Sequence, residues 1–287
     1  MDRIVKSMDE RPIGVFDSGL GGLTAATELA ELLPGERIVY LGDSYNMPYG
    51  EKTREEIVRM SCADLAFLLS KNVKAVLVAC GTATSNALDA LEMKSPVPVY
   101  GVVEPAVREA AAATENERVG VLATRATIRA GNFERMLHAV APQLTVSSQA
   151  CPKFATMVED GIFEKSDPRV TRAVEEYLPP LRDAGVDTII LGCTHYPLLA
   201  DIICEYMGGN VRLISSGAAA ARRLVADLRD ADMLSDGARG CTAYFTTGNC
   251  DAFAHTAQLM LRKDISAQLR SVEPFDKQAH IVYNNSY

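Results

Sequence analysis

The amino-acid sequence predicts an α/β protein with parallel sheets, divided into two similar units. Segments typical of strands and of helices alternate along nearly the whole chain of 287 residues, which is the pattern of parallel sheets covered by helices. Two runs, KAVLVAC at 74–80 and VDTIILGC at 186–193, are almost continuously apolar, as expected for strands buried on both faces. About nine strands are predicted, which is many for one open sheet in such a chain, so two units are favoured.

The first half of the chain begins with an apolar strand, PIGVF at 12–16, which runs into a Gly-rich turn, DSGLGG. The helix that follows at 23–33 ends at Pro34-Gly35, a pair that does not continue a helix. The other expected elements of this half are strands at 37–43, 74–80 and 96–103, a loop at 44–50, a helix at 82–91, and an amphipathic helix at 52–71 with apolar positions at Ile57, Met60, Leu65, Leu68 and Leu69.

The same alternation restarts at an Ala-rich helix at 105–113. Pro179 and Pro180 lie inside the helical segment 168–184 and predict a break or kink there. The tail after residue 270 is polar and weakly patterned. The remaining expected elements are strands at 118–124, 144–151, 186–193, 211–216 and 241–248, and helices at 126–139, 154–161, 195–207, 217–230 and 251–262.

Composition excludes several classes of function. The net charge of −8 argues against general nucleic-acid binding, which depends on Lys and Arg, and no apolar run reaches the roughly 18 residues of a membrane helix. The N-terminus is charged and has no apolar stretch of the signal-peptide type, so a cytoplasmic protein is expected. No two of the cysteines form a CxxC pair, which favours reduced thiols over a disulfide frame. The seven cysteines are Cys62, Cys80, Cys151, Cys193, Cys204, Cys241 and Cys250.

Two segments of the chain share one design. VLVACGTATSNAL at 76–88 and IILGCTHYPLL at 189–199 each read as a buried strand that ends on a cysteine, followed by a threonine and a helix. Such a pair suggests an internal duplication. The two elements are expected to face each other across a cleft.

Chemically active side chains follow several of the predicted strands. Ligands of open α/β sheets bind outside the carboxyl ends of the strands. Taken singly, each residue has a structural role open to it, because an aspartate can cap a turn and a cysteine can fill a core. Taken together, an acid, a hydroxyl and two thiols at one edge favour a functional site, formed by Asp17, Ser18, Asp43, Cys80, Cys193, Thr194 and His195.

The two thiols suggest a particular chemistry. Cys80 and Cys193 each stand where a helix is predicted to begin, and the positive end of a helix dipole lowers a thiol pKa from about 8.5 toward neutrality. A thiol with a pKa near the working pH can both accept and donate a proton. Two such thiols on opposite sides of one carbon would invert its configuration, with one removing the proton and the other returning it.

Four motifs, in this order, resemble those of the glutamate racemases of the aspartate/glutamate racemase superfamily. They are FDSGLGGLT at 16–24, PYG at 48–50, Cys-x-Thr at 80–82 and LGCTHYPLL at 191–199. The resemblance runs from Pro12 to Leu261 with the spacing intact. It implies interconversion of L- and D-glutamate for peptidoglycan synthesis, without pyridoxal phosphate, metal or other cofactor.

The resemblance also implies the domain organisation. Two pseudosymmetric α/β domains are expected with the active site in the cleft between them. Residues 12–104 with 216–270 would form the first domain and 105–215 the second, with loosely ordered ends at 1–11 and 271–287. Family members are often homodimers, so a homodimer is expected here too.

The roles of individual residues are implied by the same resemblance. Cys80 and Cys193 are the acid and base thiols, and Asp17 and His195 assist their proton movements. Asp43 and Glu159 match two further carboxylates of the family. Gly81 stands where an asparagine is usual, which bears on the choice of substrate. The expected substrate-binding residues are Asp17, Ser18, Pro48, Tyr49, Gly50, Gly81, Thr82, Thr194 and His195.

The same residues leave several alternative functions open or exclude them. A racemase for aspartate or another amino acid is the nearest, and a non-catalytic regulatory binding protein represents another class. A dinucleotide site fails because the turn after Asp17 lacks the third glycine of Gly-x-Gly-x-x-Gly. A cysteine hydrolase would pair Cys193 with a histidine only two residues away, and a zinc site would lack a tight ligand pair.

Overall fold

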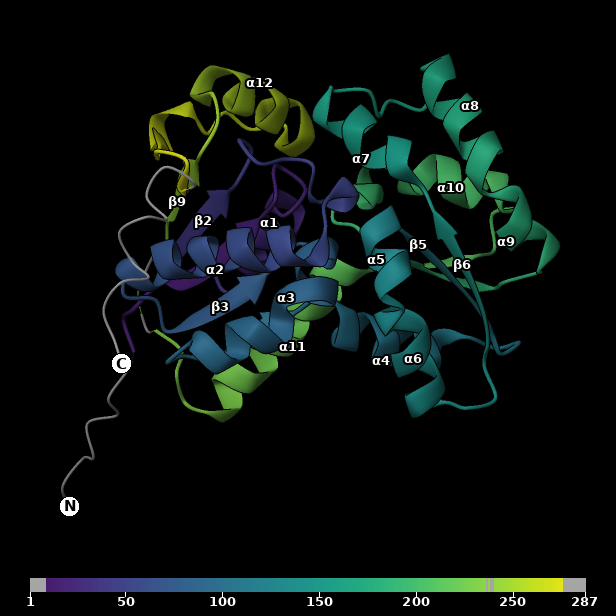
Figure 1. Cartoon of the computed structure of the whole chain (residues 1–287), viewed down its shortest axis with the longest axis horizontal. Coiled ribbons are helices and arrows are strands. Elements are labelled where there is room, and N and C mark those ends of the chain that lie inside the picture. The colour runs from purple at the N-terminus through teal and green to yellow at the C-terminus, as the bar shows by residue number, and fades with distance from the viewer. Residues whose placement is uncertain (1–8, 236, 238–239, 276–287) are drawn as a thin grey trace.

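The computed structural model describes residues 9–235, 237 and 240–275, which form two parallel β-sheets covered by helices (Figure 1). This architecture confirms the predicted α/β class with two units. The ends predicted to be loosely ordered, 1–11 and 271–287, lie largely outside the described residues.

The first sheet has six strands in the order β10-β9-β2-β1-β3-β4, and all neighbouring pairs are parallel. Its central strand β1 is fully buried and pairs Phe16 with Leu41 of β2 on one side and with Val78 of β3 on the other. The strands are β1 (Ile13–Asp17), β2 (Ile38–Gly42), β3 (Ala75–Val78), β4 (Val99–Gly101), β9 (Thr242–Thr246) and β10 (Leu269–Ser271).

The second sheet has four parallel strands in the order β6-β5-β7-β8. They are β5 (Arg118–Ala123), β6 (Thr145–Ala150), β7 (Thr188–Leu191) and β8 (Arg212–Ser215). Strands β2-β1-β3-β4 of the first sheet follow the same order as β6-β5-β7-β8, so the two units are pseudosymmetric. In each unit a cysteine lies two residues beyond the third strand: Cys80 follows β3 and Cys193 follows β7.

Helices cover both sheets (Figure 1). Helix α2 begins with a capping box, in which the Glu56 amide donates to Thr53 Oγ1 and the Thr53 amide donates to Glu56 Oε2. The helices are α1 (Leu23–Leu32), α2 (Arg54–Ser70), α3 (Gly81–Lys94), α4 (Val103–Ala113), α5 (Arg125–Ala130), α6 (Asn132–Val140), α7 (Pro152–Glu159), α8 (Pro168–Tyr177), α9 (Pro179–Asp183), α10 (Ala200–Tyr206), α11 (Ser216–Asp230) and α12 (Cys250–Leu261), with short 3₁₀ helices η1 (Tyr49–Glu51), η2 (Tyr196–Leu199) and η3 (Ser266–Gln268).

The chain crosses between the units twice. After β4 it continues into α4, which packs against β7 and β8 of the second sheet, and after β8 it returns through α11, which packs against α1. Helices α4 and α11 also contact each other. The domain division predicted at 104/105 and 215/216 stays a prediction.

Three local features differ from the sequence prediction. The helix expected at 126–139 is two helices, because Gly131 adopts a left-handed φ of +66° and ends α5. The helix expected at 195–207 starts with the 3₁₀ turn η2. Strand β10 was not predicted, since its three residues carry no periodicity and gain their strand pairing from β9. The break expected at Pro179 is present between α8 and α9.

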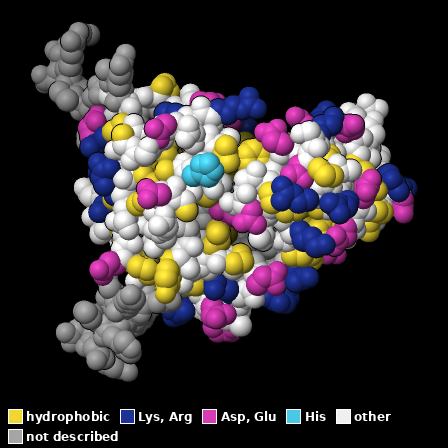
Figure 2. Space-filling model, turned by 90° about the horizontal axis from the view of Figure 1, so that it is seen from above, with side chains coloured by type: hydrophobic (Ala, Val, Ile, Leu, Met, Phe, Trp, Pro, Cys, Tyr) yellow, Lys and Arg dark blue, Asp and Glu magenta, His cyan; other side chains and the backbone are white. Residues whose placement is uncertain are grey.

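Polar surface surrounds this framework. Acidic and basic side chains are mixed over the face in Figure 2, so its described part presents no single-sign field of the kind that attracts nucleic acid. Within the residues that the structure describes, no helix has the length and apolar character needed to cross a membrane.

Candidate active site

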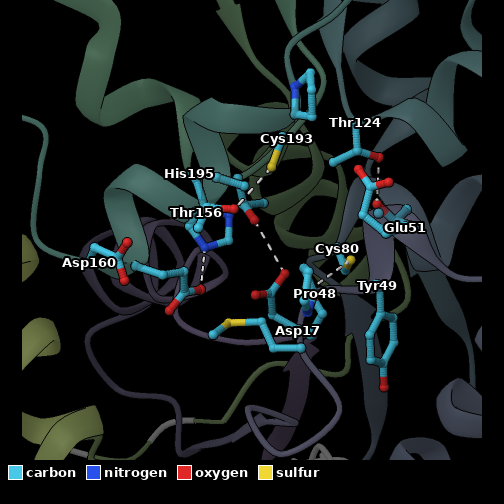
Figure 3. A pocket seen from close by; sticks show the side chains of 18 residues that line it. Asp17, Pro48, Tyr49, Glu51, Cys80, Thr124, Thr156, Asp160, Cys193 and His195 are labelled. Atoms are coloured by element: carbon cyan, nitrogen blue, oxygen red, sulfur yellow. Dashed lines mark hydrogen bonds and ion pairs between the residues drawn. The ribbon is translucent and has the colours of Figure 1, made fainter. Parts of the chain in front are cut away.

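A cavity of about 140 Å³ lies where the carboxyl ends of strands from both sheets meet (Figure 3). The first unit contributes residues after β1, β2 and β3, and the second contributes residues after β5, β6 and β7. The lining residues are Asp17, Ser18, Met47, Pro48, Tyr49, Gly50, Glu51, Cys80, Thr82, Thr124, Pro152, Ala155, Thr156, Glu159, Asp160, Cys193, Thr194 and His195.

The Cys80 thiol lies at the N-terminus of α3, as predicted, and is 4 % exposed. Its Sγ accepts a hydrogen bond from the Ala83 amide at 3.4 Å and donates to Ser18 Oγ at 3.6 Å. Burial, followed by the nearby Asp17 carboxyl, raises the pKa of Cys80 to about 12. The expectation that the helix terminus brings this pKa toward neutrality is therefore wrong, because desolvation of the thiolate outweighs the amide hydrogen bond.

The Cys193 thiol has a different environment. No α-helix begins at this residue, since η2 starts at Tyr196 and α10 at Ala200. Instead, Cys193 Sγ is 3.4 Å from Nδ1 of His195. The predicted helix dipole is thus replaced by an imidazole, which can accept the thiol proton or donate to the thiolate.

The His195 ring links this thiol to the other unit. Its Nε2 contacts Glu159 Oε1, which also accepts the Leu20 amide at 3.0 Å. Burial alone would lower the pKa of His195, but the Glu159 carboxylate and the Cys193 sulfur outweigh burial and hold the pKa well above its ordinary value. Both neighbours therefore favour the protonated form of the ring.

Asp17 joins the two units at the floor of the cavity. Its Oδ2 accepts the Gly19 amide at 2.9 Å, and its Oδ1 accepts the Thr194 hydroxyl at 3.2 Å. Burial raises the pKa of Asp17, while the His195 charge opposes that rise. The carboxyl is held within the site with its charge only partly compensated, which suits a group that exchanges protons.

Three threonine hydroxyls form a hydrogen-bonded cluster, and two of these residues, Thr82 and Thr124, line the cavity. Thr82 Oγ1 lies 2.9 Å from Thr124 Oγ1, which is 3.0 Å from Thr127 Oγ1. Thr124 was not among the predicted site residues. The signal was available, because Thr124 ends the predicted strand 118–124 just as Cys80 ends the strand at 74–80.

Two predicted site residues, Asp43 and Gly81, do not line the cavity. Asp43 is fully buried behind Tyr49 and accepts its hydroxyl at 2.5 Å. Gly81 packs against the second unit so closely that a Cβ there would lie 2.0 Å from the carbonyl oxygen of Gly192. Neither residue therefore touches the contents of the cavity, and each contacts residues that adjoin it.

The structure brings the other predicted site residues together around one cavity, while their roles stay predictions. Sequence reasoning missed several lining residues, because loop and helix side chains carry no pattern that marks them: Met47, Glu51, Pro152, Ala155, Thr156 and Asp160. Across the described part of the chain, no group of three or more His, Cys, Asp and Glu side chains is arranged to hold a metal ion.

Comparison with known proteins gives consistent results. The family model for Asp/Glu/Hydantoin racemase matches residues 23–224. Glutamate racemase of Bacillus cereus is 42 % identical over 248 residues, covering 86 % of this chain and 91 % of its own. Glutamate racemase of Beutenbergia cavernae is 44 % identical over 279 residues, covering 93 % and 94 %.

Solved structures agree with the sequence matches. The crystal structure of a glutamate racemase isoform from Bacillus anthracis has a TM-score of 0.89 at 38 % identity and covers 93 % of this chain and 99 % of its own. Glutamate racemase from Francisella tularensis, solved in complex with D-glutamate, has a TM-score of 0.85 at 31 % identity and covers 94 % and 100 %.

Proposed function

Because this chain belongs to the Asp/Glu/Hydantoin racemase family, we propose that it interconverts L- and D-glutamate by passing the α-proton between Cys80 and Cys193. One observation carries the mechanism. The two thiols reach one cavity from topologically equivalent positions in the two units, each with its own proton partner. A planar carbanion held between them could be protonated on either face.

The cavity walls fit an acidic amino acid. The hydroxyls of Ser18 and Thr82 and the backbone amides that begin α3 are donors for its carboxylates. The positive charge of the protonated His195 ring, whose two nitrogens contact Cys193 and Glu159, also favours an anionic ligand. Donors held in place before the reaction also stabilise the charge that develops on the α-carboxylate when the α-proton leaves.

In one direction, the Cys193 thiolate paired with the His195 imidazolium removes the α-proton. The electron pair of the C–H bond stays on the substrate and spreads into its α-carboxylate. The Cys80 thiol then gives its proton to the opposite face, leaving a Cys80 thiolate and a Cys193 thiol. The high pKa of Cys80 fits this donor role, because it keeps the thiol protonated before the reaction. The other enantiomer uses the same steps in reverse.

The test is a cofactor-free assay with L- and D-glutamate in ²H₂O. Turnover in both directions, with deuterium at the α-carbon of the product, is the expected result. Activity on aspartate but not on glutamate would support the two-thiol mechanism and replace glutamate by aspartate as the substrate. An absence of exchange with every amino acid would overturn the racemase proposal and favour a non-catalytic binding role.

A role in the cell wall is part of the same proposal. The D-glutamate formed would supply peptidoglycan synthesis, so cells that lack this chain are expected to need D-glutamate in the medium. Growth of a depletion strain with and without D-glutamate checks this. A cytoplasmic location and a homodimer remain predictions from the resemblance.

Replacement of Glu159 by glutamine is expected to lower the pKa of His195, because it removes the carboxylate that holds the proton on the ring. Racemisation should fall about 10²-fold, the lower end of what general acid–base groups contribute. A proton NMR titration of His195 reads the pKa directly. Glu176→Gln is the matched control, since Glu176 on α8 pairs with Lys153 of α7 at the exposed surface.

The sign of the effect on stability follows from the raised pKa. The pairing of His195 with Glu159 stabilises the fold fully below the ordinary histidine pKa of about 6.5. That contribution is lost as the pH rises through the pKa that His195 has in the folded chain. The free energy of unfolding of Glu159→Gln should therefore approach that of the native chain at alkaline pH, and a difference that grew with pH would contradict the assignment.

A further inference from the structure

A pair of buried carboxyl groups lies behind the cavity wall. Asp43, just after β2, and Asp64, on α2, are both fully buried. The hydroxyl of Tyr49 lies between them, 2.5 Å from Asp43 Oδ2 and 2.9 Å from Asp64 Oδ2. On α2, Asp64 occupies the buried face together with Met60 and Leu68, where an acidic residue is unexpected.

The two contacts of the Tyr49 hydroxyl need one more proton than a tyrosine and two ionised carboxylates carry. A tyrosine hydroxyl has a single hydrogen and can donate it to only one carboxylate. The second contact is a hydrogen bond only if that carboxyl is itself protonated and donates to the tyrosine oxygen. Two ionised carboxylates this close, away from water, would also repel each other strongly.

The surroundings decide which carboxyl carries the proton. Asp43 accepts further hydrogen bonds from the Thr247 hydroxyl at 2.7 Å and from the Asn46 side-chain amide at 3.0 Å, as an ionised carboxylate requires. Asp64 has Tyr49 alone, and its Oδ1 has no hydrogen-bond partner among the described residues. Burial and then the Asp43 charge raise the pKa of Asp64 well above its ordinary value, in agreement with the proton count.

This network reaches the cavity through Tyr49. Tyr49 and Gly50 line the cavity, whereas Asp43 and Asp64 do not. Asp43 anchors the segment at Asn46 and at Tyr49, and α2 adds the contact between Asp64 and Tyr49. Loss of the Asp64 contact would free the tyrosine hydroxyl from the helix that supports the wall.

We propose that Asp64 is a neutral carboxylic acid that donates its proton to Tyr49 and so positions the Tyr49–Gly50 wall against the substrate. Asp64 is a positioning residue, because it touches Tyr49 and not the cavity. The part that concerns substrate rests on the proposed racemisation of glutamate. The protonation of Asp64 stands independently of it.

The first test measures protonation without substrate. The infrared spectrum of the native chain at neutral pH is expected to show the carbonyl band of a buried protonated carboxyl, and Asp64→Asn is expected to remove it. Absence of the band, or its persistence in Asp64→Asn, overturns the proposal whether or not the chain acts on glutamate.

The second test compares two replacements of similar size. Asp64→Asn keeps a neutral donor toward Tyr49, so KM for glutamate should stay within about twofold of the native value. Asp64→Leu has no donor and should raise KM about tenfold, the effect of one lost hydrogen bond, with a smaller change in kcat. Equal KM values for the two variants would contradict the positioning role.

A double-mutant cycle separates positioning from general destabilisation. Asp64→Leu should raise KM in the native background but add nothing in a Tyr49→Phe background, because the hydroxyl it acts on is already gone. A structural defect unrelated to Tyr49 would add its effect in both backgrounds, and that additivity would overturn the proposal.

Discussion

Replacing either Cys80 or Cys193 by serine is expected to reduce racemisation by about 10³-fold or more, within the range that general acid–base groups contribute. A serine hydroxyl has nearly the size of the thiol but gives up its proton far less readily, so it serves poorly as a base. Among the described residues that line the cavity, Cys80 and Cys193 are the only cysteines, so no further thiol is there to take over the proton transfer. Steady-state kinetics with each enantiomer measures the loss.

The two variants should differ in the half-reaction that survives. A chain with one thiol can still remove and return the α-proton of the enantiomer that presents it to that thiol. Proton NMR in ²H₂O should therefore show α-exchange of one enantiomer with Cys80→Ser and of the other with Cys193→Ser. Exchange of the same enantiomer by both variants would contradict the opposed-thiol geometry. Cys241→Ser is the control, because Cys241 is exposed.

Addition of one methyl group at Gly81 is expected to reduce racemisation about 10²-fold, the scale of a misplacement of 1 Å at a reacting centre. A Cβ at this position would lie 2.0 Å from the carbonyl oxygen of Gly192, a backbone atom that cannot rotate away. Gly81 adjoins Cys80 and Gly192 adjoins Cys193. The two thiol-bearing segments would have to separate to make room.

The ratio of α-exchange to inversion distinguishes this separation from ordinary destabilisation. When the thiols are too far apart, one still removes and returns the proton, but the other fails to protonate the far face, so the ratio rises in Gly81→Ala. Gly14→Ala is the control, because its Cβ would crowd Val73 Cγ1 at 3.1 Å within one unit. An unchanged ratio in Gly81→Ala would show that Gly81 does not set the spacing of the thiols.

The sequence predicted the two sheets well, because a buried parallel strand is a continuous run of apolar residues that can be recognised locally. The apolar runs before Cys80 and Cys193 became β3 and β7, and each thiol reached the cavity from the same place in its unit. The break at Pro179 was predictable for a similar reason, since a proline acts on the helix that contains it.

What the sequence did not predict depends on contacts between distant segments. The raised pKa of Cys80 results from burial between the two units, which outweighs the helix terminus visible in the sequence. Asp43 followed a strand as expected, yet it bonds to Tyr49 and Thr247 behind the cavity. Asp64 gave no signal of function at all, because its partner is a tyrosine that a loop brings to the helix.

The unequal surroundings of the two thiols constrain the kinetics of an enzyme that interconverts enantiomers. Cys80 has Ser18 and the amide of Ala83, whereas Cys193 has an imidazole backed by a carboxylate. L- and D-glutamate nevertheless have the same free energy in water, and both directions pass through the same transition states. The value of kcat/KM reports the free energy of the transition state relative to free enzyme and free substrate. It must therefore be equal in the two directions. The asymmetry of the protein can appear only as a higher kcat for one enantiomer, matched by a proportionally higher KM for the same one.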